Sequence, residues 1–225
     1  MTKNVSTRER AFFLFATPRS GMAALGQKFV GWGTGFVDLD HDGWEDVFIA
    51  NGHAIRYPKT ADRSQKPVIM RNVGEGQFRI ASGRGGSYFT KPHLGRGIAL
   101  ADFDNDGKVD VAICNTNEPV AVLRNVAPAG NHWAGFSLKG AKNADVVGAR
   151  VRLTAGGRTQ TRFAKGGGSY ASTPDRRLVF GLGTADKIDK LTVEWPDGSS
   201  QDFSGVPTDK YLVLTQGEKE LKPAK

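Results

Sequence analysis

Two nine-residue acidic loops constrain this chain more than any other feature of its sequence. They are Asp38-Leu-Asp-His-Asp-Gly-Trp-Glu-Asp46 and Asp102-Phe-Asp-Asn-Asp-Gly-Lys-Val-Asp110, and both follow the pattern D-x-D-x-D-G-x-x-D. Carboxylates this close repel one another, because at about 5 Å and an effective dielectric constant of about 20 each pair costs roughly 3 kcal/mol. A chain that repeats this arrangement at matching positions is expected to hold a cation in each loop.

The residue types favour calcium as that cation. Hard oxygen ligands at alternating positions suit Ca²⁺, which accepts six to eight oxygens in a flexible shell. Gly43 and Gly107 permit the sharp turn that directs the flanking carboxylates inward. A metal-free hairpin rich in aspartate and asparagine is the alternative, and two loops of one pattern make it the weaker interpretation.

The flanking residues exclude an EF-hand. An EF-hand loop needs a bidentate Glu at position twelve and a helix on each side, but position twelve is Ile49 in one loop and Ile113 in the other. The flanking segments are apolar and partly β-branched, which predicts strand–loop–strand sites. These segments are residues 34–37, 47–50, 98–101 and 111–114.

Composition favours an all-β globular chain. The 225 residues are 39% hydrophobic and 24% charged and include 29 glycines, and helical periodicity is scarce, so many tight turns between strands are expected. No apolar run approaches the length of a membrane span. The net charge of +8 is scattered without a dense basic run, which ranks nucleic-acid binding last. The single cysteine, Cys114, excludes an intrachain disulfide and is expected to be a buried thiol.

The two loops belong to a repeated unit. The loops lie 64 residues apart, each follows a Gly-x-Gly segment, and Phe15–Gly21 precedes the first as Phe78–Gly83 precedes the second. Segments 67–73 and 119–126 both end in Arg-Asn-Val. The pattern predicts about two four-stranded blades of a partial β-propeller over residues 11–126. Residues 11–17 are expected to form an outer strand, and 51–66 an exposed insertion.

The second half predicts a small β-sandwich over residues 131–216, after a Pro/Gly/Ala junction at 127–130, with a disordered tail at 217–225. Alternation is clearest at Val151-x-Leu153 and Leu191-x-Val-x-Trp195. The predicted strands are 132–138, 148–154, 159–165, 177–181, 190–195, 200–203 and 211–215.

The first half resembles FG-GAP (VCBS-type) β-propeller repeats. The resemblance rests on the order Gly-x-Gly, D-x-D-x-D-G-x-x-D and Arg71-Asn-Val-Gly-Glu-Gly-Gln-Phe78; the second unit departs from it after Asn125. The resemblance implies two structural calcium ions, held by side chains at loop positions one, three, five and nine and by a backbone carbonyl at position seven. Those ligands would be Asp38, Asp40, Asp42, Trp44 and Asp46, and Asp102, Asp104, Asp106, Lys108 and Asp110.

The second half resembles the ASPIC/UnbV domain. The matching motifs include Asn131-His-Trp133, Gly148-Ala-Arg-Val151, Phe180-Gly-Leu-Gly183 and Val193-Glu-Trp-Pro-Asp-Gly198. Together the two halves resemble the cartilage acidic protein family and its bacterial relatives. That resemblance implies a secreted protein, extracellular or periplasmic, although residues 11–16 make a poor signal peptide. Because a propeller closes with four to eight blades, a chain with about two is expected to be the C-terminal part of a longer propeller protein.

The sequence shows no recognisable catalytic motif. Lys165-Gly-Gly-Gly-Ser169 lacks the spacing of a phosphate-binding loop, and His41, His53, His93 and His132 lack zinc-ligand spacing. Two function classes remain open. One is a non-catalytic calcium-binding interaction module for a protein or glycan partner, recognised through segment 51–66 or the glycine-rich corner at Tyr170. The other is a secreted hydrolase, or a non-catalytic part of one. Two blades cannot close a ring, so exposed blade faces predict self-association or missing blades as partners.

Overall fold

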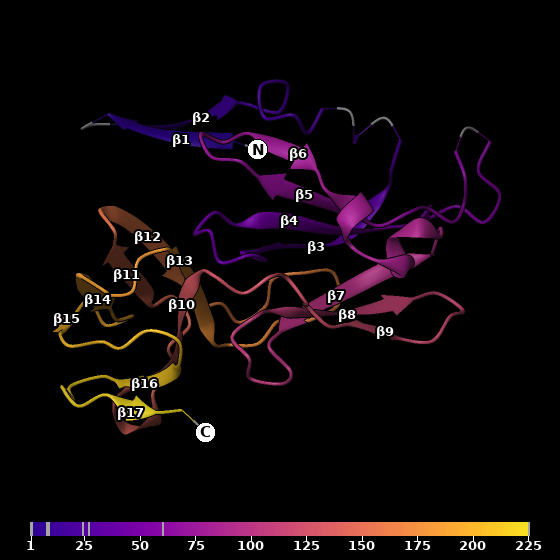
Figure 1. Ribbon diagram of the computed structural model, residues 1–225. Helices are drawn as coiled ribbons and strands as arrows, with labels where there is room; N and C mark the ends of the chain where they lie inside the picture. Colours follow the sequence, from indigo (N-terminus) through magenta and orange to yellow (C-terminus); the bar gives the residue numbers. More distant parts are fainter. Residues whose placement is uncertain (1, 8–9, 24, 27, 60, 225) are drawn as a thin grey trace.

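The computed structural model describes residues 2–7, 10–23, 25–26, 28–59 and 61–224 of the chain. Strands dominate the described residues, and their sheets are open, with none closed into a ring. Two sheets of the first half lie side by side, and the strands of the second half gather next to them (Figure 1). The all-β prediction of a partial propeller followed by a sandwich is confirmed.

The first blade has four antiparallel strands in the order of the sequence. They are β3 (Gly31–Val37), β4 (Asp46–Asn51), β5 (Val68–Asn72) and β6 (Phe78–Ile80). Alternation along the strands gives each blade face its own core, because neighbouring side chains point to opposite sides. Val47, Met70 and Phe78 form a cluster on one face. Phe48 packs from the other face toward the second blade.

The second blade has three antiparallel strands. They are β7 (Gly95–Ala101), β8 (Asp110–Asn115) and β9 (Ala121–Leu123). Two short 3₁₀ helices, η1 (Ser82–Arg84) and η2 (Ser87–Thr90), connect the blades. They place Phe89 in a cluster that includes Phe48 of the first blade and Ile98, Val111 and Ile113 of the second.

The second half forms two four-stranded sheets that enclose the largest core cluster of the described chain. One sheet has the order β13-β10-β16-β17 and the other β12-β11-β14-β15. In β11, Val151 and Leu153 are buried while Arg152 between them is exposed, as the alternation predicts. The two sheets bury Phe136 and Phe180 between them. The bounds are β10 (His132–Lys139), η3 (Ala141–Asn143), β11 (Arg150–Ala155), β12 (Arg158–Phe163), β13 (Leu178–Gly183), β14 (Lys190–Glu194), β15 (Ser200–Phe203), β16 (Tyr211–Thr215) and β17 (Lys222–Pro223).

The chain differs from the sequence expectations at four places. Within the described residues the second blade has three strands where four were predicted. Cys114 is exposed, because Val111 and Ile113 take the core-facing positions of β8 and leave Cys114 on the opposite face. The segment predicted as a disordered tail contains β17, which pairs with β16, while Leu221 packs against the sandwich core. Strand β2 (Arg10–Phe15) pairs with β1 (Thr2–Thr7) instead of joining either blade.

The sandwich core should be sensitive to loss of volume. Leu153 is fully buried, and Leu→Ala replacements at such sites cost about 2–5 kcal/mol. We expect Leu153→Ala to lower the free energy of unfolding by about that amount in chemical denaturation, whereas Val147→Ala, at a half-exposed position, should change it by less than about 1 kcal/mol. Equal effects of the two replacements would contradict the assigned core.

Candidate metal sites

The first acidic loop connects β3 to β4 and gathers three carboxylates. Asp38, Asp40 and Asp42 each offer an oxygen, and these oxygens lie within 4.8 Å of one another. The turn depends on Gly43, whose φ of +83° suits glycine. Its N–H donates to Asp38 Oδ2 at 2.8 Å, which fixes the first-position carboxylate against the turn.

The second loop connects β7 to β8 and repeats this geometry. Asp102, Asp104 and Asp106 form the second group of three with oxygens within 4.8 Å. Gly107 has a φ of +91°, and its N–H donates to Asp102 Oδ2 at 2.7 Å. Position four also has a positive φ in both loops, +57° at His41 and +59° at Asn105. The two loops therefore share one backbone conformation, as their common pattern predicts.

The ninth-position aspartates have a different surrounding from the three gathered carboxylates. Asp46 accepts N–H groups from Leu39 at 3.4 Å and from Asn72 at 2.8 Å. Asp110 accepts the equivalent groups from Phe103 at 3.0 Å and from Asn125 at 2.7 Å. Each ninth-position carboxylate thus joins the start of its loop to the asparagine at or just after the end of the third strand.

The seventh-position residues lie at the end of the same turn. The N–H of Trp44 donates to Asp42 Oδ1 at 2.8 Å, and the N–H of Lys108 donates to Asp106 Oδ1 at 2.9 Å. These bonds fix the carboxylate at position five in both loops. The backbone at position seven is therefore held next to the carboxylate cluster.

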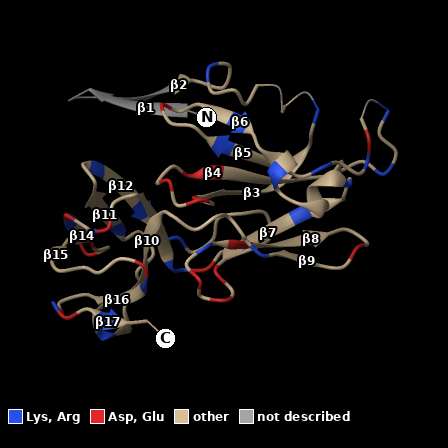
Figure 2. Cartoon of the chain, viewed as in Figure 1, with Lys and Arg blue, Asp and Glu red and all other residues tan. Residues whose placement is uncertain are grey.

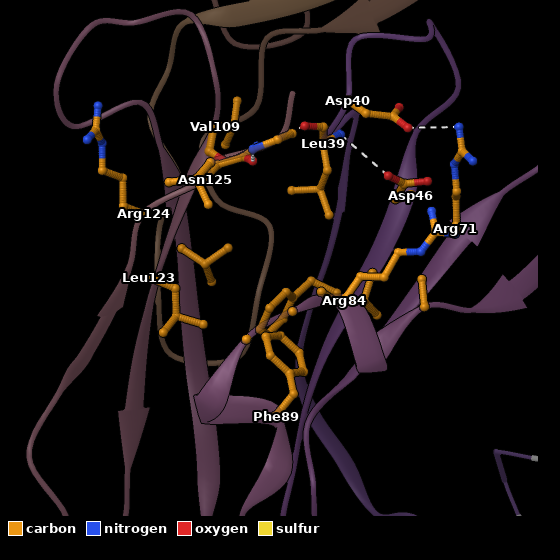
Figure 3. Close-up of a pocket in the computed structure, with 18 of the residues that line it drawn as sticks. Leu39, Asp40, Asp46, Arg71, Arg84, Phe89, Val109, Leu123, Arg124 and Asn125 are labelled. Atoms are coloured by element: carbon orange, nitrogen blue, oxygen red, sulfur yellow. Dashed lines mark hydrogen bonds and ion pairs between the residues drawn. The ribbon is translucent and has the colours of Figure 1, made fainter. Parts of the chain in front are cut away.

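Two residue pairs of the site were missed by the sequence reasoning, although the repeated Arg-Asn motif was visible. Arg71 Nη2 lies 2.8 Å from Asp40 Oδ2 (Figure 3). It also lies 3.2 Å from Asp42 Oδ2. Arg124 Nε lies 2.6 Å from Asp104 Oδ2. Asn72 and Asn125 make the backbone contacts described for position nine. The motif therefore supplies a guanidinium beside the carboxylates and an asparagine that fixes the loop.

The electrostatics of the first loop fit a hard cation. Burial raises the pKa of Asp38 to about 7, and it raises the pKa of Asp46 to about 7 as well. Asp38 Oδ1 and Asp40 Oδ1 are buried and have no hydrogen-bond partner within the described chain, and a buried unpaired carboxylate oxygen is costly. Both oxygens belong to the gathered carboxylates, so this oxygen-only donor set suits a divalent cation such as Ca²⁺.

The loops face the sandwich, where it packs against the ends of the blades (Figure 2). Tyr211 Oη donates to Asp102 Oδ2 at 2.7 Å, and Asn131 Nδ2 donates to the carbonyl of Asp40 at 2.8 Å. The guanidinium of Arg158 lies over the ring of Trp44 at 3.5 Å and donates to the carbonyl of Gly43. Both candidate metal sites therefore lie at the junction of blades and sandwich.

The glycine-rich corner contributes to the same junction. Ser169 Oγ accepts the N–H of Thr34 at 3.0 Å, and Ser172 Oγ donates to the carbonyl of Ile98 at 2.5 Å. The ring of Tyr170 packs edge-on against Trp32. These contacts attach the sandwich to the first strand of each blade. The corner therefore has a structural role that its sequence did not reveal.

The hydroxyl of Tyr211 offers a test of this junction. Burial and the neighbouring Asp102 raise the pKa of Tyr211 above its ordinary value, so it remains a hydrogen-bond donor. Tyr211→Phe keeps the ring beside Trp133 but removes the bond to the Asp102 carboxylate. Hydrogen bonds to charged groups contribute about 1.5–3 kcal/mol, and we expect a loss of that size in urea denaturation with EDTA present. Tyr170→Phe, at a half-exposed ring, is the matched control, and an equal loss there would contradict the assignment.

Each half of the chain matches a known protein family. Residues 38–113 match the family described as FG-GAP-like repeat, and residues 139–221 match the family described as ASPIC and UnbV. Cartilage acidic protein 1 of Xenopus tropicalis is 28% identical over 172 residues, which cover 72% of this chain and 25% of that protein. The Mus musculus protein of the same name is 28% identical over 182 residues, or 79% of this chain and 27% of that protein. The chain spans about a quarter of the length of these curated relatives. It thus joins an FG-GAP-like repeat region to an ASPIC and UnbV domain, and in this combination it resembles cartilage acidic protein 1.

Proposed function

We propose that this chain is an extracellular, non-catalytic interaction module that binds two structural calcium ions, one in each blade. The observation that carries the proposal is the pair of carboxylate groups Asp38, Asp40, Asp42 and Asp102, Asp104, Asp106. The unpartnered buried oxygens of the first group add support. Ions held there would offset the carboxylate repulsion, with Asp46 and Asp110, and the carbonyls of Trp44 and Lys108, as the remaining proposed ligands.

A structural role for the ions follows from where the loops lie. Each loop joins two strands of one blade and also contacts the sandwich through its own carbonyls or carboxylates. Neutralising the carboxylates would therefore stabilise the blade turn and the junction together. Asp38 and Asp102 are buried at the junction, whereas Asp104 and Asp106 are exposed. The buried first-position carboxylates suit a structural ion better than a catalytic centre.

The extracellular assignment is supported by the resemblance to cartilage acidic protein 1. Within the described residues, no helix has the length and apolar character needed to cross a bilayer. Extracellular calcium, at millimolar concentration, would suffice even for weak sites of the affinity that extracellular modules show. The proposed partner is a protein or a glycan. Lysines and arginines are distributed over both halves of the chain (Figure 2).

The secreted hydrolase remains the second candidate, because propellers also host enzymes. Three of the histidines are held in separate places. His41 contacts the carbonyl of Gly107, His93 contacts Glu118, and His132 contacts Asp209. None of these pairs includes a serine, threonine or cysteine nucleophile of the kind that a histidine base activates, and the arrangement therefore favours the interaction module.

Calcium binding should stabilise the chain. A ligand that binds only the folded state contributes about 2.7 kcal/mol at a hundredfold excess over its Kd. We expect the melting temperature of EDTA-treated protein, followed by scanning calorimetry, to rise with added calcium. Asp40→Asn combined with Asp104→Asn should remove most of the rise, since each change takes one charge from a site. Asp62→Asn at an exposed position is the control. If added calcium does not change the melting temperature of the parent protein, the proposal is wrong.

The hydrolase alternative has a separate test. Glycosidase, esterase and phosphatase substrates would be offered to the purified protein with calcium and with EDTA. We expect no turnover above the buffer background in either condition. Calcium-dependent turnover that a single side-chain replacement abolishes, with the melting temperature preserved, would refute the non-catalytic assignment and establish the enzyme.

A further inference from the structure

The two blades differ at their outer edge. In the first blade β6 pairs with β5, and Phe78 lies opposite Asn72. The counterpart of β5 in the second blade is β9, since each of these two strands carries or precedes the Arg-Asn motif of its blade. Within the described residues β9 pairs with β8 alone. The second blade therefore has an open strand edge where the first has a fourth strand, and such an edge can pair with an added strand.

A cavity lies beside this open edge, between the two blades (Figure 3). It has a volume of about 370 Å³. Its apolar lining includes Val111, Leu123 and Phe89 from the second unit and its connection, together with Phe48 and Ile69 from the first blade. Asn125 lies at the edge of the same cavity. The cavity and the β9 edge together are called the β9 socket below.

The first blade shows what fills the equivalent space. Phe78 is 3% exposed and packs with Val47 and Met70. Val47 lies opposite Met70 in the first blade, and Val111 lies opposite Leu123 in the second. Val111 and Leu123 are therefore the counterparts of Val47 and Met70. The β9 socket is therefore lined by the counterparts of the residues that hold Phe78. It has the position and apolar character to accept a phenylalanine from a fourth strand.

The backbone of the β9 edge is suited to the same pairing. In the first blade the N–H of Ala81 donates to the carbonyl of Ile69 at 2.8 Å. Val122 is the counterpart of Ile69, because Ile69 pairs with Phe48 as Val122 pairs with Ala112. Its backbone polar groups are expected to point toward the open edge in the same way. The side chain of Val122 is 63% exposed.

The charges around the socket restrict what can bind. An added strand in the β6 register would place the residue after its phenylalanine opposite Arg124, whose side chain is 64% exposed and also pairs with Asp104. The lining of the cavity has three arginines, Arg71, Arg84 and Arg124, against two carboxylates, Asp40 and Asp46. Opposite charges on directly facing residues stabilise antiparallel pairs. The surroundings therefore favour an acidic residue after the phenylalanine.

We propose that the β9 socket binds an extended acidic segment of a partner protein, with a phenylalanine in the cavity and a carboxylate facing Arg124. The proposal deepens the interaction role proposed above, but it does not require calcium. A second copy of this chain is a poorer occupant. Its segment Phe15–Gly21, which aligns with Phe78–Gly83, has Ala16 after the phenylalanine and Pro18 at the place of Ala81. Proline has no N–H to donate to the Val122 carbonyl.

A peptide copied from the first blade tests the proposal. Its sequence is that of residues 74–82 with Arg79→Glu, labelled with a fluorophore at its N-terminus. We expect saturable binding to the full chain, measured by fluorescence anisotropy with calcium and again with EDTA. Replacing the peptide phenylalanine by alanine should weaken binding at least tenfold, because the buried ring contributes about 1.5–3 kcal/mol. Keeping arginine at position 79 should also weaken it, and added salt should reduce the difference between the two peptides.

In the first blade the N–H of Ile69 donates to Ser82 Oγ at 3.0 Å. Val122→Pro is the matched protein variant, because proline is tolerated on an edge strand but has no N–H to donate to the serine of the peptide. It should weaken binding about two- to tenfold, the effect of losing one hydrogen bond, while the melting temperature stays close to that of the parent chain. Equal binding of the phenylalanine and alanine peptides, or no effect of Val122→Pro in a folded variant, would overturn the proposal. Self-association of the parent chain that Val122→Pro abolishes would also overturn it, in favour of a second copy as occupant. Binding that persists in EDTA while calcium fails to raise the melting temperature would support the socket and reject the calcium sites.

Discussion

The first-position carboxylates, Asp38 and Asp102, are 4% and 3% exposed where the blades meet the sandwich. Burying a carboxylate is unfavourable unless hydrogen bonds or an opposite charge compensate it. The chain provides part of that compensation with the turn N–H groups of Gly43 and Gly107 and with Tyr211. The position of both blades relative to the sandwich depends on how this burial is balanced.

The compensation is unequal between the two loops. Asp102 receives the Tyr211 hydroxyl in addition to its own turn, while Asp38 Oδ1 has no partner among the described residues and its pKa is raised to about 7 by burial. The first loop is therefore the one whose folding gains most from a bound cation. An ion there would act on a group that is buried and partly unsatisfied, which is where the low local dielectric makes a charge most effective.

Much of this architecture could be predicted from the sequence, because its strongest signals are local. Alternation in β11 and β14, the glycine of each acidic loop and the apolar segments around the loops fixed the fold class and the sandwich strands to within a few residues. The contacts between distant segments could not be predicted. Nothing in the spacing places Arg158 over Trp44 or Tyr211 on Asp102, since those pairs are separated by more than a hundred residues. Cys114 was misplaced for the same reason, because the face of β8 that is buried depends on which neighbour packs there.

The repeat explains why the blades diverge where they do. In the first unit, Gly74 has a φ of +89° and Gly76 a φ of +73°, so the chain can turn back after Asn72 and lay Phe78 beside β5. In the second unit, Ala127 and Ala129 stand at the positions of those glycines, with Pro128 at the place of Glu75 between them. Glu75 has a φ of +51° in that turn, which proline cannot adopt, and alanine is strained at the positive φ of the two glycines. The chain continues into the sandwich instead. The change of turn residues that directs the chain into the sandwich therefore also leaves the second blade without a fourth strand. The open edge of β9 and the junction with the sandwich have the same cause.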